Sequence, residues 1–246
     1  GKNLQDHLQT RPVFKTTLST VNTEINSYLK KGLIAAKYAF TQRGPMTMAA
    51  SLGTGFLKTE AHLETPDIQF HIQPWSALKP ADGPHKFSAF TASVLQLRPE
   101  SAGHLTLSSA NIDDHPEIHP NYLSTDTDCR TIVKGIQIAR RIAQSEPLKS
   151  HITEEYAPGV GVALEDEVAT LDWARQTSVT IYHPTGTCKM GIDPMAVVDP
   201  SLKVKGIRGL RVADASIMPR IVSGNTNAPA IMIGEKASQL VLEDAS

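Results

Sequence analysis

The chain has 246 residues, of which 40% are hydrophobic, enough to form the core of one large domain or two ordinary ones. Its 24 Lys and Arg are matched by 25 Asp and Glu, and the formal net charge of −1 indicates neither a nucleic-acid partner nor a polybasic membrane-surface segment. No stretch approaches the roughly 20 apolar residues of a membrane span, so a small neutral ligand is the expected partner.

The first half of the chain predicts one helix and several strands. Residues 6–17 pass through Pro12 and predict an entering or edge strand. Residues 24–40 carry apolar side chains at helical spacing and predict a helix, with Asn22 or Thr23 as its cap. Residues 41–57, rich in Gly, Met and Ala, are either the wall of a pocket or a connector.

An antiparallel sheet is expected next in the chain. Alternating apolar residues predict strands over 67–75, 87–97 and 104–107. Amphipathic spacing predicts helices over 126–143 and 165–176. Together these elements predict an α+β fold, with helices packed on one side of the sheet.

The C-terminal segment has a different texture. It predicts a short strand over 210–213, a turn over 214–219 and an apolar helix over 228–242. One short strand and one apolar helix need other elements to cover them. No G-x-G-x-x-G follows a strand, so a dinucleotide-binding entry is not expected within these residues.

Two stretches near the C-terminus carry the chemistry. His183 lies between residues that shape the backbone, Pro184 and Gly186, and an imidazole near neutral pKa is a natural proton acceptor. Asn225 follows Gly224 just before the apolar helix, and its amide is suited to orienting an alcohol oxygen. A lone His in a turn is, by itself, more often structural than catalytic.

Other reactive residue types predict no further site. The remaining histidines show no paired spacing, so no metal site is expected. Cys188 has no dedicated base beside it and is expected in the core. Cys129 and Cys188 do not form a secreted disulfide framework, and no signal peptide is visible in a chain that opens on Gly1, which together favour a cytoplasmic location.

Several motifs follow one another along the chain: Gly1-Lys2-Asn3-Leu4-Gln5-Asp6-His7, Arg98-Pro99-Glu100-Ser101-Ala102-Gly103-His104, His183-Pro184-Thr185-Gly186-Thr187-Cys188-Lys189-Met190-Gly191, Val198-Asp199-Pro200, Leu210-Arg211-Val212-Ala213-Asp214-Ala215 and Asn225-Thr226-Asn227. In this order they resemble the glucose–methanol–choline (GMC) family of flavin-dependent alcohol oxidoreductases. The Cys-Lys-Met-Gly variant resembles the choline-dehydrogenase-like branch. The resemblance covers nearly the whole chain. It implies that the chain is the C-terminal half of an enzyme.

The resemblance implies a domain plan and a cofactor. Residues 1–178 are expected to be a substrate-binding domain, and residues 179–246 to carry the catalytic motif and part of an FAD-binding, Rossmann-like domain. An N-terminal FAD-binding segment of the same enzyme is the implied partner. The implied FAD contacts are Asp214, Ala215, Thr226 and Asn227. An Asp after a strand is otherwise usually a cap or turn former.

The implied reaction is oxidation of a primary alcohol to an aldehyde, with hydride passing to flavin N5. His183 is then the general base and Asn225 orients the alcohol. Choline itself is disfavoured, because no carboxylate lies within Gly53-Thr54-Gly55-Phe56, where choline-using relatives place one, and Glu60 is the nearest. The alternatives are a hydroxynitrile lyase of the same fold and a non-catalytic fragment of a flavoenzyme.

Overall fold

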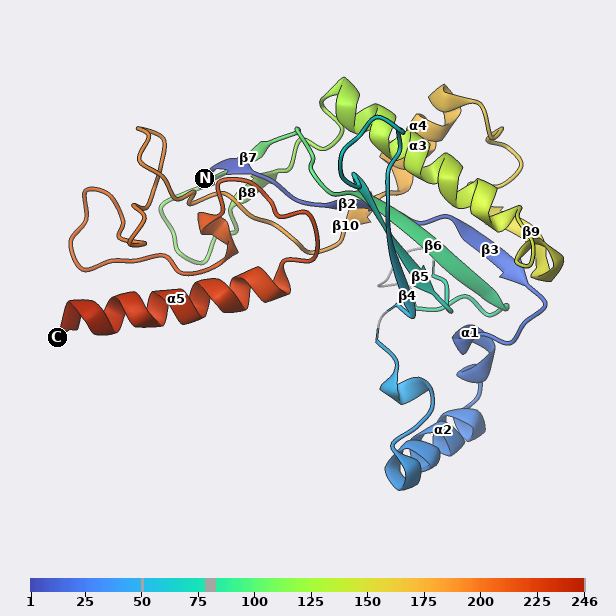
Figure 1. The fold of residues 1–246 in the computed structure, drawn as a ribbon. Coiled ribbons are helices and arrows are strands. Elements are labelled where there is room, and N and C mark those ends of the chain that lie inside the picture. The colour runs from blue at the N-terminus through green and yellow to red at the C-terminus, as the bar shows by residue number, and fades with distance from the viewer. Residues whose placement is uncertain (50, 78–82, 246) are drawn as a thin grey trace. The chain divides into compact units, whose positions relative to one another are not determined.

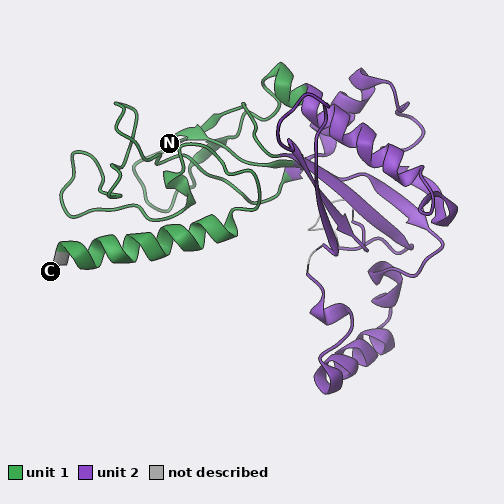
Figure 2. Cartoon of the chain, in the orientation of Figure 1, with its two compact units in different colours: residues 1–8, 97–129, 180–246 green, residues 9–96, 130–179 purple. Residues whose placement is uncertain are grey.

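The computed structural model describes residues 1–49, 51–77 and 83–245. The chain divides into two compact units (Figure 2): unit 1 comprises residues 1–8, 97–129 and 180–246, and unit 2 comprises residues 9–96 and 130–179. The boundary expected after residue 178 lies one residue before the point where the chain passes from unit 2 back to unit 1, between residues 179 and 180. Residues 1–8 and 97–129, however, group with the C-terminal segment. Assigning substrate binding to one segment and cofactor binding to the other stays a prediction.

Unit 2 is built around an antiparallel sheet (Figure 1). Its strands are β2 (Leu8–Thr10), β3 (Val13–Thr16), β4 (Gly53–Leu57), β5 (Ile68–Gln73), β6 (Ala89–Gln96), β9 (Ile152–Ala157) and β10 (Val179–Thr180). The central strand β6 pairs antiparallel with β5 along one edge and with β2 and then β3 along the other. β5 and β6 are buried at nearly every position, as expected for strands covered on both faces.

The single strand expected over residues 6–17 is two strands. The chain breaks between β2 and β3 at Pro12, which has no N–H to donate to a ladder, although its carbonyl still accepts from Ala92 N–H at 3.0 Å. β3 is also not an edge strand, because β9 pairs with it on the side opposite β6. The sequence pattern of residues 6–17 correctly predicted extended backbone. It wrongly predicted an edge position for what is now β3, which has a neighbour on each side.

Two long helices follow the predictions closely. α3 (Asp126–Ala143) and α4 (Glu167–Thr177) lie on one side of the sheet in Figure 1. Gly135 of α3 faces the sheet, and a Cβ there would lie 2.8 Å from Val94 of β6, so the glycine permits close helix–sheet packing. The expected combination of helices with an antiparallel sheet is confirmed.

The helix expected over residues 24–40 is interrupted. α1 (Val21–Glu24) ends before α2 (Tyr28–Thr41), and Ser27 caps α2 by accepting from Lys30 N–H at 3.2 Å. The predicted cap at Asn22 or Thr23 was wrong. Asn22 is buried, and its amide donates to the carbonyls of Ser76 at 2.9 Å and His85 at 2.8 Å. Its side chain is therefore used in tertiary packing.

The Gly- and Met-rich stretch after α2 lines a cavity. The 3₁₀ turn η1 (Pro45–Thr47) and its neighbours Gly44 and Met48 share a cavity of about 590 Å³ with Thr20 of the α1 cap. This observation favours the pocket-wall alternative for part of residues 41–57. Strand β4, which ends the stretch, was not expected.

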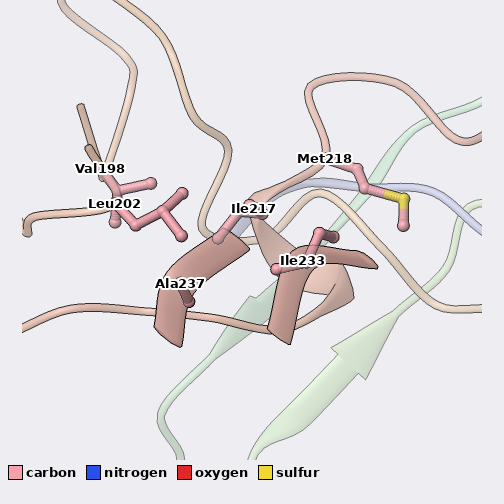
Figure 3. Packing of buried hydrophobic residues seen from close by; sticks show 6 residues of the cluster. All are labelled: Val198, Leu202, Ile217, Met218, Ile233 and Ala237. Atoms are coloured by element: carbon pink, nitrogen blue, oxygen red, sulfur yellow. The ribbon is translucent and has the colours of Figure 1, made fainter. Parts of the chain in front are cut away.

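Unit 1 contains a second, smaller sheet and a separate core. The sheet has the order β1 (Lys2–Leu4), β7 (Gly103–Thr106), β8 (Glu117–His119). The strand predicted over residues 104–107 was expected to belong to the main sheet, and this expectation was wrong. The core lies between the loops, the 3₁₀ turn η4 (Ala215–Ile217) and α5 (Asn227–Ala245). Figure 3 shows its buried members Val198, Leu202, Ile217, Met218, Ile233 and Ala237.

Residues 210–213 do not form the expected strand. Arg211 makes one isolated bridge with Lys203, and the surrounding residues form turns. A further 3₁₀ turn, η3 (Lys149–His151), precedes β9. Within the described ranges, no helix combines the length and the apolar character that crossing a membrane requires.

Candidate active site

His183 lies in a loop whose backbone is held in an unusual conformation. The preceding residue, Tyr182, has φ of 63°, in the left-handed region that non-glycine residues rarely occupy. Two hydrogen bonds hold this turn: Tyr182 N–H donates to Thr180 Oγ1 at 2.8 Å, and His183 N–H donates to Asp6 Oδ1 at 2.9 Å. The backbone therefore fixes the direction in which the His183 imidazole leaves the chain.

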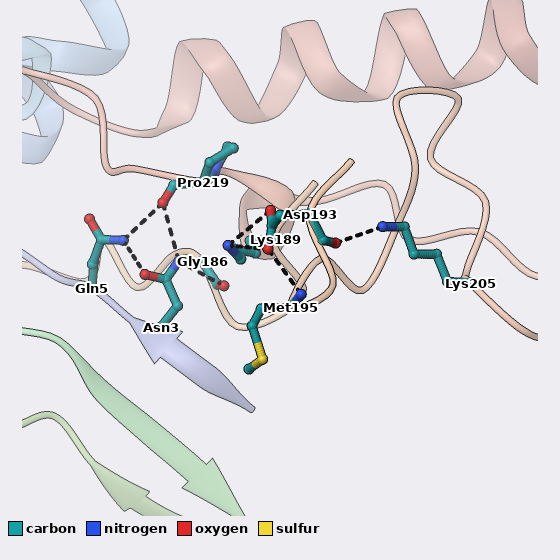
Figure 4. Close-up of polar contacts among 8 residues, drawn as sticks. All are labelled: Asn3, Gln5, Gly186, Lys189, Asp193, Met195, Lys205 and Pro219. Atoms are coloured by element: carbon teal, nitrogen blue, oxygen red, sulfur yellow. Dashed lines mark hydrogen bonds and ion pairs between the residues drawn. The ribbon is translucent and has the colours of Figure 1, made fainter. Parts of the chain in front are cut away.

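The N-terminal strand is fastened to the loop that carries His183. Gln5 and Thr185 exchange backbone hydrogen bonds of 3.0 and 2.8 Å. The Asn3 side-chain amide donates to the carbonyls of Gly186 and Pro219, both at 3.2 Å (Figure 4). Gly186 has φ of 90°, and a Cβ there would lie 2.3 Å from the Asn3 carbonyl oxygen. Only glycine fits this close approach.

A charged pair supports the far side of the same loop. Lys189 Nζ lies 3.1 Å from Asp193 Oδ1, and the same oxygen accepts from Met195 N–H at 2.9 Å (Figure 4). The hydrogen bond from Lys189 is the main reason that the pKa of Asp193 lies below its usual value. This ion pair is exposed, so its contribution to the free energy of unfolding is small.

The buried carboxylate of Asp6 joins four donors around His183. Its Oδ1 accepts from the backbone N–H groups of His7 and His183, both at 2.9 Å. Its Oδ2 accepts from the hydroxyls of Thr180, at 2.5 Å, and Tyr122. Burial and the Asp6 carboxylate raise the pKa of Tyr122, so its hydroxyl keeps its proton. These four hydrogen bonds fix the position of the Asp6 carboxylate beside the His183 backbone.

The His183 imidazole is buried between two polar side chains. Its Nδ1 lies 2.9 Å from Nδ1 of His7, and its Nε2 lies 3.3 Å from Nδ2 of Asn225. An amide nitrogen only donates, so Nε2 of His183 accepts and its neutral ring carries the proton on Nδ1. Burial lowers the pKa of His183, an effect that the nearby Asp6 charge partly opposes. Near neutral pH the uncharged His183 ring therefore has its lone pair on Nε2, facing the Asn225 amide.

The structure places the two predicted catalytic residues together. His183 and Asn225 are 42 residues apart in the chain and within hydrogen-bond distance in space. An imidazole lone pair beside an amide donor is able to take a proton and to hold the oxygen that loses it.

Two of the four residues predicted to contact FAD lie at the start of η4, and the other two lie at the start of α5. Asp214 is exposed and caps η4 by accepting from Ser216 N–H at 2.7 Å, and Ala215 is half-buried in the same turn. Thr226 is buried, and Asn227, the first residue of α5, is exposed. The first turn of α5 carries no acidic residue, so its amide end is electrostatically suited to an anionic or carbonyl group. Exposed polar side chains beside such amides fit a flavin nucleotide.

Sequence reasoning missed Asp6, His7 and Tyr122. The segment Asp6-His7 was used only as part of a family motif and was given no role. Both residues are buried, and both contact His183, which lies more than 170 residues later in the chain. The one local signal was a pair of adjacent ionisable residues, and that signal does not identify a partner so distant in the chain.

Comparison with known proteins identifies the family. The sequence profile described as GMC oxidoreductase matches residues 99–234, more than half of the chain. The chain belongs to the GMC oxidoreductase family. The resemblance stated from its motifs is thus confirmed, together with FAD as the cofactor of the family.

The relatives include several dehydrogenases. The chain is 41% identical to an "alcohol dehydrogenase [acceptor]" of Pseudomonas putida, covering 98% of this chain and 44% of that protein. It is 39% identical to the mitochondrial choline dehydrogenase of Mus musculus, with coverages of 98% and 40%. The chain therefore spans less than half the length of the curated relatives it matches.

Solved structures share the fold. A pyridoxine 4-oxidase of Mesorbium loti superposes with a TM-score of 0.78 at 26% identity, covering 97% of this chain and 43% of that one. A formate oxidase variant of Aspergillus oryzae superposes with a TM-score of 0.89 at 25% identity, with coverages of 99% and 47%. Both are named as oxidases of small molecules.

Proposed function

We propose that the protein oxidises a primary alcohol to the aldehyde with FAD. His183 takes the hydroxyl proton and Asn225 orients the oxygen. The observation that supports this most directly is the contact of 3.3 Å between Nε2 of the buried His183 and Nδ2 of Asn225. The names of the relatives, which include alcohol and choline dehydrogenases, agree with chemistry at a CH–OH group.

The reaction removes a proton and a hydride from the substrate. The O–H bond breaks as His183 Nε2 forms its N–H bond, and the ring becomes an imidazolium. Bound FAD supplies the acceptor for the hydride that leaves the carbinol carbon. The imidazolium formed at His183 is stabilised by the Asp6 carboxylate, whose charge raises the pKa of the ring.

Asn225 holds the substrate oxygen while its negative charge develops. In the free protein its Nδ2 donates to His183 Nε2 over a long 3.3 Å contact, which an alcohol can replace at little cost. The amide has two N–H donors, so it is able to bond the oxygen as an alcohol and as an alkoxide. A donor placed where charge develops stabilises the transition state more than the ground state.

The FAD contacts are assigned to Asp214, Ala215, Thr226 and Asn227. Asn227→Ala is expected to weaken retention of FAD because an exposed amide beside the α5 amide end is lost. Asn225→Ala is expected instead to slow flavin reduction with FAD content unchanged. FAD content measured from the absorbance of the purified variants, and reduction rates with benzyl alcohol, distinguish the two. Reversed phenotypes would show that the two asparagines had been exchanged.

The proposed partner is an N-terminal FAD-binding segment of the same enzyme that packs on α5. Ile231, Met232, Val241 and Leu242 of this helix are between 50% and 68% exposed. Such an apolar surface calls for a cover, and the proposed cover is the Rossmann-like half that carries a glycine-rich phosphate loop.

The proposed substrate is a neutral primary alcohol, with choline disfavoured. β4 and its neighbours contain no carboxylate before Glu60, and Glu60 forms an ion pair with Lys134. A carboxylate paired with Lys is a poor site for a quaternary ammonium group, because the charge it would offer is already compensated.

Anaerobic mixing of the flavoenzyme with benzyl alcohol tests the reaction class. The proposal expects bleaching of the oxidised flavin band with formation of benzaldehyde. Cyanohydrin cleavage needs the same His183 and Asn225 without a redox step. A flavin that stays oxidised while mandelonitrile is cleaved would therefore replace the proposal with a lyase, and a chain that never holds flavin would favour a non-catalytic fragment.

A further inference from the structure

We propose that His7 is a positioning residue that fixes the proton of His183 on Nδ1 and so keeps Nε2 free to accept a proton. The inference rests on the proposed function of His183 and deepens it. His7 is fully buried, and its own ring nitrogens face the Leu97 carbonyl and His183. Neither nitrogen is left to touch substrate, so its influence passes through His183.

The proton positions of His7 follow from its two partners. His7 Nε2 lies 3.0 Å from the Leu97 carbonyl oxygen, which only accepts, so Nε2 carries the proton. In the neutral ring Nδ1 then has a lone pair. Nδ1 of His183 lies 2.9 Å away from that lone pair, and a hydrogen bond forms only if His183 Nδ1 carries its proton.

Two independent contacts thus specify the same tautomer of His183. The His7 contact requires a proton on Nδ1, and the Asn225 amide requires a lone pair on Nε2. The rings of His7 and His183 meet edge to face, with centroids 5.2 Å apart and planes at 81°. This geometry leaves little freedom for the His183 ring to turn over. The chain from the Leu97 carbonyl to Asn225 is a one-directional relay of hydrogen bonds.

The relay works only while His7 is neutral. A protonated His7 would present N–H against the N–H of His183 and reverse the arrangement. Burial is the main cause that lowers the pKa of His7 to about 4, and His183 lowers it further, against the Leu97 carbonyl and Asp6, which raise it. Asp6 is the charged group beside His7 and His183, and its Oδ2 accepts hydrogen bonds from the hydroxyls of Thr180 and Tyr122. His7 therefore remains an acceptor throughout the neutral range.

During proton transfer His7 keeps its own proton. The substrate O–H bond breaks, Nε2 of His183 gains the proton, and the Nδ1–H of His183 still donates to His7. No proton moves to His7, because burial lowers its pKa to about 4 and makes its ring a weak base. Without His7, the Nδ1–H of His183 would be buried with no acceptor, which costs more free energy than the long 3.3 Å contact with Asn225 returns. The proton of neutral His183 then moves to Nε2, and in that tautomer the ring cannot accept one from the alcohol.

Two substitutions separate positioning from packing. His7→Leu removes the acceptor, whereas His7→Asn places Oδ1 on the same Cγ substituent position as Nδ1 and retains an acceptor. In the holoenzyme with benzyl alcohol, His7→Leu is expected to lower the flavin reduction rate by about 10²-fold or more, a loss on the scale of a general base. His7→Asn is expected to recover most of that loss. His104→Leu, at a half-buried histidine stacked on His119, is the matched control.

A spectroscopic readout reports the tautomer without turnover. In holoenzyme labelled with ¹⁵N-histidine, His183 is identified by the signals that disappear in His183→Ala. The wild type and His7→Asn are expected to show a protonated Nδ1 and an unprotonated Nε2, and His7→Leu to show protonation at Nε2. A His7→Leu protein that binds FAD with unchanged tautomer and rate would overturn the inference. If His183→Ala itself turns over normally, the proposed function fails, and the tautomer signals still decide the role of His7.

Discussion

At the scale of single residues, burial sets the base strength of His183. Desolvation lowers its pKa from the ordinary 6.5, and the Asp6 carboxylate raises it in part. A general base works only in its neutral form, so the rate rises with pH as His183 loses its proton. The acid limb of the rate of flavin reduction is therefore expected below pH 6.5. A limb above that value, measured by stopped flow over a pH series, would contradict a buried His183 as the base.

Asp6→Asn tests the opposing contribution to the same pKa. The amide Oδ1 is able to keep both backbone N–H bonds, while the negative charge that favours the imidazolium disappears. The acid limb is expected to shift to lower pH than in the wild type, and the rate on the plateau to fall because the imidazolium loses its stabilising charge. An unshifted limb with unchanged plateau would show that Asp6 only shapes the loop. Tyr122→Phe, which keeps the carboxylate charge, is the comparison.

At the level of elements, Gly186 fixes the approach of β1 to the loop that carries His183. Gly186→Ala is expected to lower the free energy of unfolding by about 2 kcal/mol or more, because φ of 90° is strained for Ala and the new Cβ meets the Asn3 carbonyl oxygen. Gly32→Ala is the matched control. Gly32 lies inside α2 with open space around it, so this change is expected to stabilise by about 0.5–1 kcal/mol. Equal effects in chemical denaturation of the two variants would contradict the packing described.

Elements whose contacts are local were predictable from sequence. α3 has the predicted bounds because its apolar spacing reports one buried face, and β5 and β6 follow their apolar runs. The errors occurred where a distant partner decides the outcome. Asn22 is bonded to Ser76, 54 residues later in the chain, and so does not cap α2.

The same distinction divides the candidate site. Motif and chemistry select His183 and Asn225, and the structure brings them to 3.3 Å. The contacts that tune His183 come from Asp6 and His7 at the other end of the chain. Their register against residues 180–185 depends on long-range backbone pairing, such as that of Gln5 with Thr185. Periodicity within one segment carries no information about such pairing.

At the scale of the whole molecule, the exposed face of α5 predicts an intramolecular partner. Replacing Met232 and Leu242 by Lys is expected to reduce FAD retention and thermal stability of the flavoenzyme, since both side chains are assigned to the cover that completes the FAD-binding half. Replacing the exposed Glu243 by Lys on the same helix is the control. If the double variant matches the control in melting temperature and FAD content, α5 faces solvent and the proposed packing is wrong.

The proposed transfer of the substrate proton to His183 is tested by single-turnover flavin reduction in His183→Ala. Anaerobic stopped flow with saturating benzyl alcohol isolates the chemical step, and the absorbance before mixing reports the FAD content of the same sample. We expect a reduction rate lower by about 10²–10⁴-fold with FAD fully retained, because proton acceptance is lost and the FAD contacts are unchanged. A rate close to that of the wild type would contradict the proposed transfer.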